Sequence, residues 1–254
     1  MSSIVQGSTH SPWQSYLQEA KCEALRMLRE PAFCLPVIGF PVLFYLLFGV
    51  LLDKGEGKAA QYLLATYGAF GVIGAGLFGF GVTIAVDREK GLLRLKRALP
   101  VPPGALLLAK MVMAMSFAAI ISLVLAVIAA TVAGVALEPS QWIRLFVIDV
   151  LGVLPFAAIG LYVGALVGGN AAPALLNVLY LPMAFLSGLW LPLTLLPGIL
   201  STIAPLWPAY HLGQLALKVV GFDMGQPVWM HVMVLAGITV LFFVLAQRRL
   251  SAAE

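Results

Sequence analysis

The chain has 254 residues, of which 61% are hydrophobic and only 10% are charged. Ordinary soluble domains contain roughly 45–50% apolar residues, so this composition, with a mean hydropathy of +1.01, excludes a water-soluble globular protein. The net charge is +4. The positions of the basic residues indicate that this charge reflects membrane topology and not nucleic-acid binding.

Residues 1–31 predict a cytoplasmic segment that ends in an amphipathic helix. The polar start has no apolar stretch before a small-residue cleavage site, so it is not a removable signal peptide. Leu17, Leu25 and Leu28 fall at helical spacing, with Glu23 and Arg26 on another face, and Pro31 ends the pattern. Such a helix lies in the membrane interface. Two roles remain open for it, a simple anchor and a contact with a partner protein.

Long charge-free runs after residue 31 predict an all-α polytopic membrane domain over residues 32–254. A helix needs about 20 apolar residues to cross a hydrocarbon core of about 30 Å, and the run over residues 150–217 is too long for one crossing. We divide that region at GGNAAP, residues 168–173, which gives six spans. The predicted spans are residues 32–52, 60–86, 110–137, 145–167, 174–195 and 226–246.

Basic residues orient these spans. Six crossings place both termini and the loop over residues 87–109 on one side of the membrane, and eleven of the fifteen Lys and Arg residues fall on that side. Because short cytoplasmic loops carry the excess of Lys and Arg, both termini are predicted to be cytoplasmic. Trp142, Trp190, Trp207 and Trp229 fall near the opposite ends of the spans, where indole rings settle at the headgroup level.

The second span is rich in small residues. Gly71, Ala75, Gly79 and Thr83 recur every four residues and would let another helix approach closely. We expect this ridge to serve tight packing inside the subunit, with a sliding contact or a substrate path as the alternative.

The loop over residues 87–109 begins DREKGLLRLKRAL and predicts a short amphipathic helix. Leu92, Leu95 and Leu99 define one face, Arg94 and Arg97 lie on a basic face, and prolines follow from residue 100. Basic interfacial helices also bind anionic lipid. The acids at positions 87 and 89 would weaken that attraction, so a protein partner fits better.

Prolines interrupt the region before the last span. Each one removes a backbone donor and clashes with the preceding helical turn, so residues 196–220 predict a re-entrant pair of short helices that dips into the outer leaflet and returns. We expect His211, at the end of this segment, to make a structural hydrogen bond and not to contact substrate.

The DREKG segment, the basic helix after it, Pro100 and Lys110 together resemble the cytoplasmic signature of type 2 ATP-binding-cassette permeases, written E-x-E-[KR]-G-T-L-E. The six-span count and FLSGLWLPLTLLPGILSTIAPLWPAYHL before the last span are also similar to that family. The chain departs from the signature at Asp87, Leu92 and Arg94, where the family often has Glu, Thr and Glu.

This resemblance implies the transmembrane subunit of an exporter in a prokaryotic plasma or inner membrane. It implies a dimer, homodimeric or heterodimeric, served by two separate ATPase subunits that carry ATP and Mg²⁺. The implied ATPase-coupling residues are Asp87, Arg88, Glu89, Lys90, Gly91, Arg94, Arg97, Glu23 and Arg26. The implied outer-gate residues are Trp190, Pro192, Pro197, Pro205, Pro208, Tyr210 and His211.

We expect the chain itself to bind no cofactor and to catalyse no reaction. It lacks the G-x-x-x-x-G-K-[ST] loop that holds nucleotide phosphates, and its three histidines are scattered. Asp149 is the one acid predicted inside a span, where an ionisable group is a functional candidate. Because Arg144 is close in sequence, we expect Asp149 to pair with it or to reach water.

Spans almost free of charge favour an amphipathic, drug-like or lipid-like substrate. Polysaccharide export, which the same family serves, remains an alternative. A secondary transporter driven by an ion gradient would normally carry polar ion-binding groups at the midplane of two repeated halves, and neither a repeat nor such groups are evident. A membrane scaffold or sensor would explain the basic loop but not the proline-rich segment.

Overall fold

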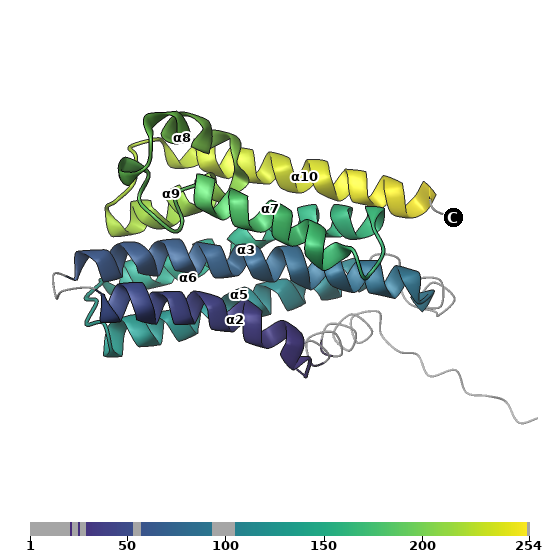
Figure 1. Cartoon of the computed structure of the whole chain (residues 1–254), viewed down its shortest axis with the longest axis horizontal. Helices are drawn as coiled ribbons and strands as arrows, with labels where there is room; N and C mark the ends of the chain where they lie inside the picture. Colours follow the sequence, from purple (N-terminus) through teal and green to yellow (C-terminus); the bar gives the residue numbers. More distant parts are fainter. Residues whose placement is uncertain (1–20, 22–24, 26–28, 53–56, 93–104, 253–254) are drawn as a thin grey trace, which may run out of the picture.

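The computed structural model describes residues 21, 25, 29–52, 57–92 and 105–252, and the described part is helical without strands (Figure 1). The helices follow in the order α2 (Pro31–Phe44), η1 (Tyr45–Leu51), α3 (Lys58–Glu89), α5 (Ala105–Thr131), α6 (Pro139–Leu166), α7 (Ala172–Leu186), η2 (Leu193–Leu195), α8 (Gly198–Ile203), η3 (Ala204–Leu206), α9 (Pro208–Val220) and α10 (Val228–Ala252).

The long helices run side by side in a bundle, with α3 at its centre (Figure 1). α3 packs against α2, α5, α6, α7 and α9 and is buried over most of its length. The start of α2 and the end of α10 lie at one end of the bundle, which we call the C-terminal end. The short helix α8 lies at the other, which we call the α8 end.

The closest helix crossing joins α3 to α6, and glycines on both helices permit it. A Cβ atom added at Gly160 would lie 2.5 Å from the carbonyl oxygen of Leu77, and one at Gly164 would lie 2.3 Å from that of Gly81. Small residues allow this approach of two backbones inside a membrane. The ridge of small residues predicted on α3, which begins at Gly71, does not face α6. An added Cβ at Gly71 would instead meet Pro41 on α2 and Ile121 on α5. That ridge therefore packs inside the subunit against α2 and α5.

Among the described residues, five helices are long and apolar enough to cross a membrane. They are Phe33–Leu51, Lys58–Glu89, Ala109–Thr131, Pro139–Leu166 and Val228–Leu250. Together with the apolar composition, they identify an all-helical integral membrane protein.

The fifth predicted span, residues 174–195, is shorter in the structure. α7 has 15 residues and ends at Leu186, which gives a length of about 22 Å. It ends there because Gly188 adopts a left-handed backbone conformation, with φ of +78°, which glycine tolerates without steric cost. The predicted span continues through Ser187 and Gly188 because the residues that follow them are apolar.

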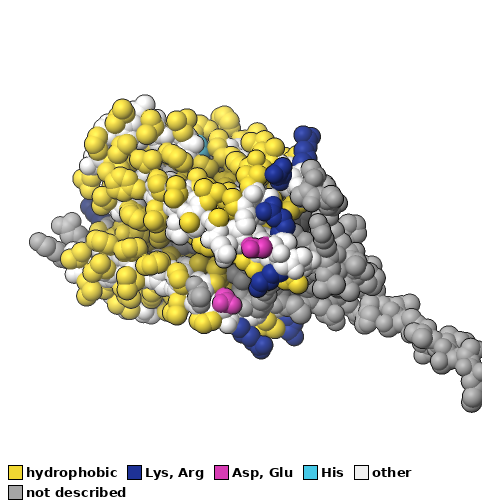
Figure 2. Space-filling model, turned by 45° about the vertical axis from the view of Figure 1, so that its right-hand side comes forward, with side chains coloured by type: hydrophobic (Ala, Val, Ile, Leu, Met, Phe, Trp, Pro, Cys, Tyr) yellow, Lys and Arg dark blue, Asp and Glu magenta, His cyan; other side chains and the backbone are white. Residues whose placement is uncertain are grey.

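The surface is divided between apolar and charged regions (Figure 2). Apolar side chains cover the body, whereas most of the visible Lys and Arg side chains gather on the right of the view. Leu35, Val178 and Leu206 are 71%, 70% and 80% exposed, which in a soluble protein would be costly but suits contact with lipid or a partner helix. Most of the predicted interfacial helix and of the amphipathic helix after Leu92 lies outside the described residues.

Candidate functional site

The C-terminal end of α3 carries a buried polar cluster. The side chains of Asp87 and Lys110 are both 0% exposed, and Lys110 Nζ lies 3.4 Å from Asp87 Oδ2. Lys110 also donates a 3.1 Å hydrogen bond to the Thr83 hydroxyl. Removing one partner of a buried ion pair is strongly destabilising, because the other charge stays in an apolar environment. This pair therefore ties the end of α3 to the start of α5.

The next two residues bind α3 to the connection between α6 and α7. Arg88 donates from its two terminal nitrogens to the carbonyl oxygens of Ala165 and Val167, the latter at 2.9 Å. Glu89 Oε2 accepts a 2.7 Å hydrogen bond from the backbone amide of Gly169. Hydrogen bonds to charged groups are stronger than neutral ones. We call these contacts, together with the Asp87–Lys110 pair, the α3 end cluster.

The structure thus divides the residues that the sequence assigns to ATPase coupling. Asp87, Arg88 and Glu89 make contacts within the subunit, whereas Lys90 is exposed and Gly91 has a φ of +69°. The predicted coupling residues Arg94, Arg97, Glu23 and Arg26 lie outside the described residues. The pairing role of Lys110 was not predicted, although a lysine that borders a long apolar run indicates a buried partner.

At the α8 end, the prolines begin or border short helices. Pro192 precedes η2, Pro197 precedes α8, Pro205 lies in η3 and Pro208 begins α9. Proline suits the first helical turn, where its missing N–H has no partner to bind in any case. Two short helices, α8 and α9, therefore occupy the segment predicted to re-enter the membrane.

Trp190 and Pro192 line a cavity of about 830 Å³ between η1, α3, α9 and the segment after α7. Its walls are mainly aromatic and aliphatic, and they include Phe44, Tyr62 and Tyr67. Ser187 Oγ and Trp190 Nε1 are buried without a hydrogen-bond partner among the described residues. Pockets of this size with few polar groups suit small amphipathic molecules. Pro197, Pro205, Pro208, Tyr210 and His211 do not line this cavity.

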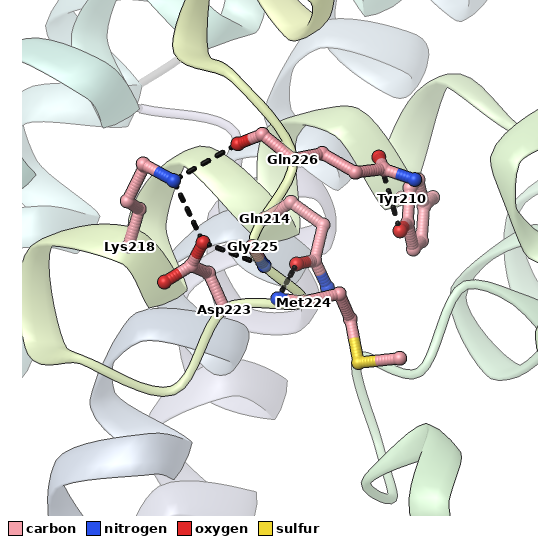
Figure 3. Close-up of polar contacts among 7 residues, drawn as sticks. All are labelled: Tyr210, Gln214, Lys218, Asp223, Met224, Gly225 and Gln226. Atoms are coloured by element: carbon pink, nitrogen blue, oxygen red, sulfur yellow. Dashed lines mark hydrogen bonds and ion pairs between the residues drawn. The ribbon is translucent and has the colours of Figure 1, made fainter.

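A polar network fixes one wall of this cavity (Figure 3). Lys218 Nζ on α9 donates to Asp223 Oδ2 at 2.8 Å and to the Gln226 carbonyl oxygen at 2.9 Å. Gln214 Oε1 accepts a 2.8 Å hydrogen bond from the Met224 amide. The hydrogen bond from Lys218 lowers the pKa of Asp223. The loop over residues 221–227 is thereby held against α9, and two of its side chains line the cavity.

Tyr210 and His211 lie together but beside the cavity. His211 Nε2 lies 2.9 Å from the Pro205 carbonyl oxygen, so this nitrogen carries the proton and donates it. His211 Nδ1 then accepts from His231 Nδ1 on α10, at 2.9 Å. The predicted structural hydrogen bond of His211 is present. Its second partner, His231, could not be predicted from the sequence, because 20 residues separate the two histidines.

Asp149 lies about 15 Å along α6 from Pro139, and it is only 5% exposed. The expectation that it pairs with Arg144 is wrong. Arg144 instead donates to the carbonyl and hydroxyl oxygens of Ser140, one turn earlier in the same helix. Asp149 points to the other side of α6, toward Gly68 on α3 and Ser122 on α5.

No group of His, Cys, Asp and Glu side chains suited to a metal ion occurs in the described part of the chain. The functional candidates are therefore the α3 end cluster, the 830 Å³ cavity and the buried carboxylate on α6.

Comparison with known proteins gives two matches. The family model described as ABC-2 type transporter matches residues 17–220. A protein named "Putative transport permease YvfS" from Bacillus subtilis (strain 168) is 27% identical over 235 residues, which cover 91% of this chain and 94% of that protein. The family match includes α3, the α3 end cluster and the proline-rich segment. It confirms the family that was inferred from the resemblance of the DREKG segment.

Proposed function

Because the chain belongs to the ABC-2 type transporter family, and is thus a transmembrane transport subunit, we propose that it serves an ATP-driven exporter of amphipathic, drug-like or lipid-like compounds. Separate ATPase subunits, which hold ATP and Mg²⁺, dock on the loop over residues 87–100. The subunit works as a homodimer in a prokaryotic plasma membrane, with both termini in the cytoplasm.

The α3 end cluster is the observation that carries this proposal. A force applied to residues 87–91 reaches α5 through the Asp87–Lys110 pair, and it reaches α6 and α7 through Arg88 and Glu89. The loop that the family resemblance assigns to the ATPase is therefore continuous with contacts to three further helices. Such contacts suit rigid-body movement of packed helices between two arrangements.

The cavity supports the choice of substrate class. Its volume of about 830 Å³ and its aromatic walls suit an apolar body, while Ser187 Oγ and Trp190 Nε1 offer hydrogen bonds to a polar group. We propose that this cavity holds the substrate at one stage of transport. A polysaccharide, which presents hydroxyl groups on every side, would leave most of them facing apolar walls.

Co-purification with the ATPase subunit tests the proposal. The full-length chain is expressed with its host's soluble ATPases, purified and reconstituted into liposomes. We expect an ATPase to remain bound, ATP to drive uptake of a fluorescent phospholipid or drug, and the double substitution Arg94→Glu and Arg97→Glu to abolish both. The matched control is Arg248→Glu with Arg249→Glu, which reverses two basic residues near the end of α10.

Two results would contradict the proposal. If no ATPase binds the wild type and an imposed ion gradient alone drives transport, the chain is a secondary transporter. If both double substitutions reduce ATPase binding equally, the effect is one of general surface charge and the loop is not the docking site.

A further inference from the structure

A second cavity, of about 470 Å³, lies between α3, α5 and α6, and Asp149 lines it. Apart from the Asp149 carboxylate and the hydroxyl groups of Ser122 and Thr131, its walls are almost entirely apolar. They include the rings of Trp142 and Phe146. This cavity is separate from the one beside Trp190, and none of the sequence motifs accounts for it.

The Asp149 carboxylate has room at this site but few partners. Ser122 lines the same cavity as the carboxylate, and Oδ1 has no partner among the described residues. Gly68 on α3 makes the space, because a Cβ atom there would lie 3.1 Å from Asp149 Oδ2. The nearby guanidinium of Arg144 is bound to Ser140. Among the described residues, no cationic side chain lines this apolar cavity beside the acid.

The chemistry of the walls selects the kind of cation that would pair with this acid. A carboxylate is costly to bury unless a cation and hydrogen bonds accompany it. Calcium and magnesium need several oxygen ligands, whereas this cavity offers one carboxylate and two hydroxyl groups. An organic ammonium group with an apolar body fits better, since the body can contact aliphatic side chains and the ammonium can approach an aromatic face.

The cavity opens on the side of the bundle. Leu123 and Val127 on α5 and Ile143 on α6 line it, and they are 54%, 60% and 64% exposed. Such exposed apolar side chains on membrane-spanning helices suit contact with lipid. A ligand could therefore enter laterally from the bilayer.

We propose that the cavity between α3, α5 and α6 binds a lipophilic amine, with its ammonium group paired to Asp149. The apolar body lies against Trp142, Phe146 and the aliphatic side chains of α5. This site needs neither an ATPase subunit nor transport, so it stands independently of the function proposed above.

Direct binding tests the proposal. The full-length chain is placed in phosphatidylcholine nanodiscs, and binding of tritiated dodecylamine is measured with empty nanodiscs subtracted. We expect saturable binding that dodecanol, of the same chain length but uncharged, does not displace. Asp149→Asn keeps the shape of the side chain but removes the charge, and it should weaken binding about tenfold or more.

Control variants separate the site from general effects. Glu30→Gln removes an exposed acid just before α2 and should bind dodecylamine as the wild type does. Val127→Trp fills the mouth of the cavity at an exposed position, so it should reduce binding without disturbing the fold, even if Asp149→Asn fails to fold. Unchanged binding in Asp149→Asn, retained binding in Val127→Trp, or equal displacement by dodecanol would each overturn the proposal.

Discussion

Among single residues, Lys110 has the least replaceable side chain of the α3 end cluster. Its ammonium group is fully buried, and it contacts both Asp87 and Thr83. The long lysine side chain loses its rotamer freedom when it is placed there. The contact therefore stabilises the fold only because the packing of α3 against α5 already fixes the positions of the two partners.

We predict that Lys110→Met destabilises the protein by about 3–5 kcal/mol, because it removes the buried cation that faces Asp87. The measurement is thermal unfolding of the detergent-purified chain, followed by tryptophan fluorescence. Lys90→Met is the matched control, since Lys90 is exposed at the end of the same helix. Equal melting temperatures for the two variants would show that the pair contributes nothing to stability.

The Lys218–Asp223 pair gives a prediction for pH dependence. The hydrogen bond from Lys218 lowers the pKa of Asp223 from its ordinary value of 3.8. The folded protein therefore favours the carboxylate more than the unfolded chain does, so this stabilisation is present above the ordinary pKa. It is lost as the pH falls through the lowered one.

We accordingly expect Asp223→Asn to lower the melting temperature near neutral pH and to lose this effect in strong acid, below the folded pKa. Melting curves of wild type and variant across the acidic range provide the measurement. A difference that stays constant over the whole range would mean that the side chain acts by shape and not by charge.

Among the helices, the crossing of α3 and α6 has the least tolerance for added volume. Gly164 faces the backbone of α3, and backbone atoms cannot move aside as a flexible side chain can. Overpacking of a well-packed core costs about 1–3 kcal/mol even where side chains can adjust. The crossing therefore depends on glycine for its interaxial distance.

We predict that Gly164→Ala lowers the melting temperature and the yield of folded protein, because its Cβ would lie 2.3 Å from the Gly81 carbonyl oxygen. Gly237→Ala on α10 is the control, as an added Cβ there meets nothing within 4 Å. Since alanine favours a helix over glycine, the control should be as stable as the wild type or slightly more so. Similar losses in both variants would refute the packing argument.

The sequence shows that α3 would pack closely but not which of its glycines meets α6. Regular spacing draws attention to Gly71 and Gly79, whereas Gly76 and Gly81 meet the α6 backbone. The choice depends on the rotation of α3 about its axis, which long-range packing decides. In the same way, hydropathy alone extends α7 beyond Leu186, because it does not register that Gly188 adopts a left-handed conformation.

In the whole molecule, α3 joins the 830 Å³ cavity to the α3 end cluster. Its 32 residues correspond to about 48 Å. Lys58 and Tyr62 near its start line the 830 Å³ cavity, and Arg88 near its end binds the α6–α7 connection. The sequence predicts this end-to-end organisation from its charge distribution and proline positions. The partners of the charged residues could not be predicted, because Ala165, Val167 and Gly169 contribute only backbone groups, which no side-chain pattern reveals.

A rigid α3 would transmit movement at its charged end to the cavity, and Arg88 is the contact through which α6 and α7 follow. If the ATPase docks on the loop over residues 87–100, as we propose, Arg88→Met should leave docking and ATP hydrolysis unchanged. The movement of the loop would then no longer reach α6, α7 and the cavity. We therefore predict that Arg88→Met retains bound ATPase while ATP-driven transport falls by about tenfold or more, consistent with the loss of two hydrogen bonds from a charged group.

Transport and ATP hydrolysis measured on the same proteoliposomes test this prediction, with Arg249→Met at the exposed end of α10 as the control. A parallel loss of both activities would place Arg88 in ATPase docking. Full retention of both would show that the contacts to Ala165 and Val167 do not transmit the movement. Loss of transport with ATP hydrolysis retained identifies Arg88 as the link between the docking loop and the cavity. Only a residue that acts between these two regions would separate the two activities.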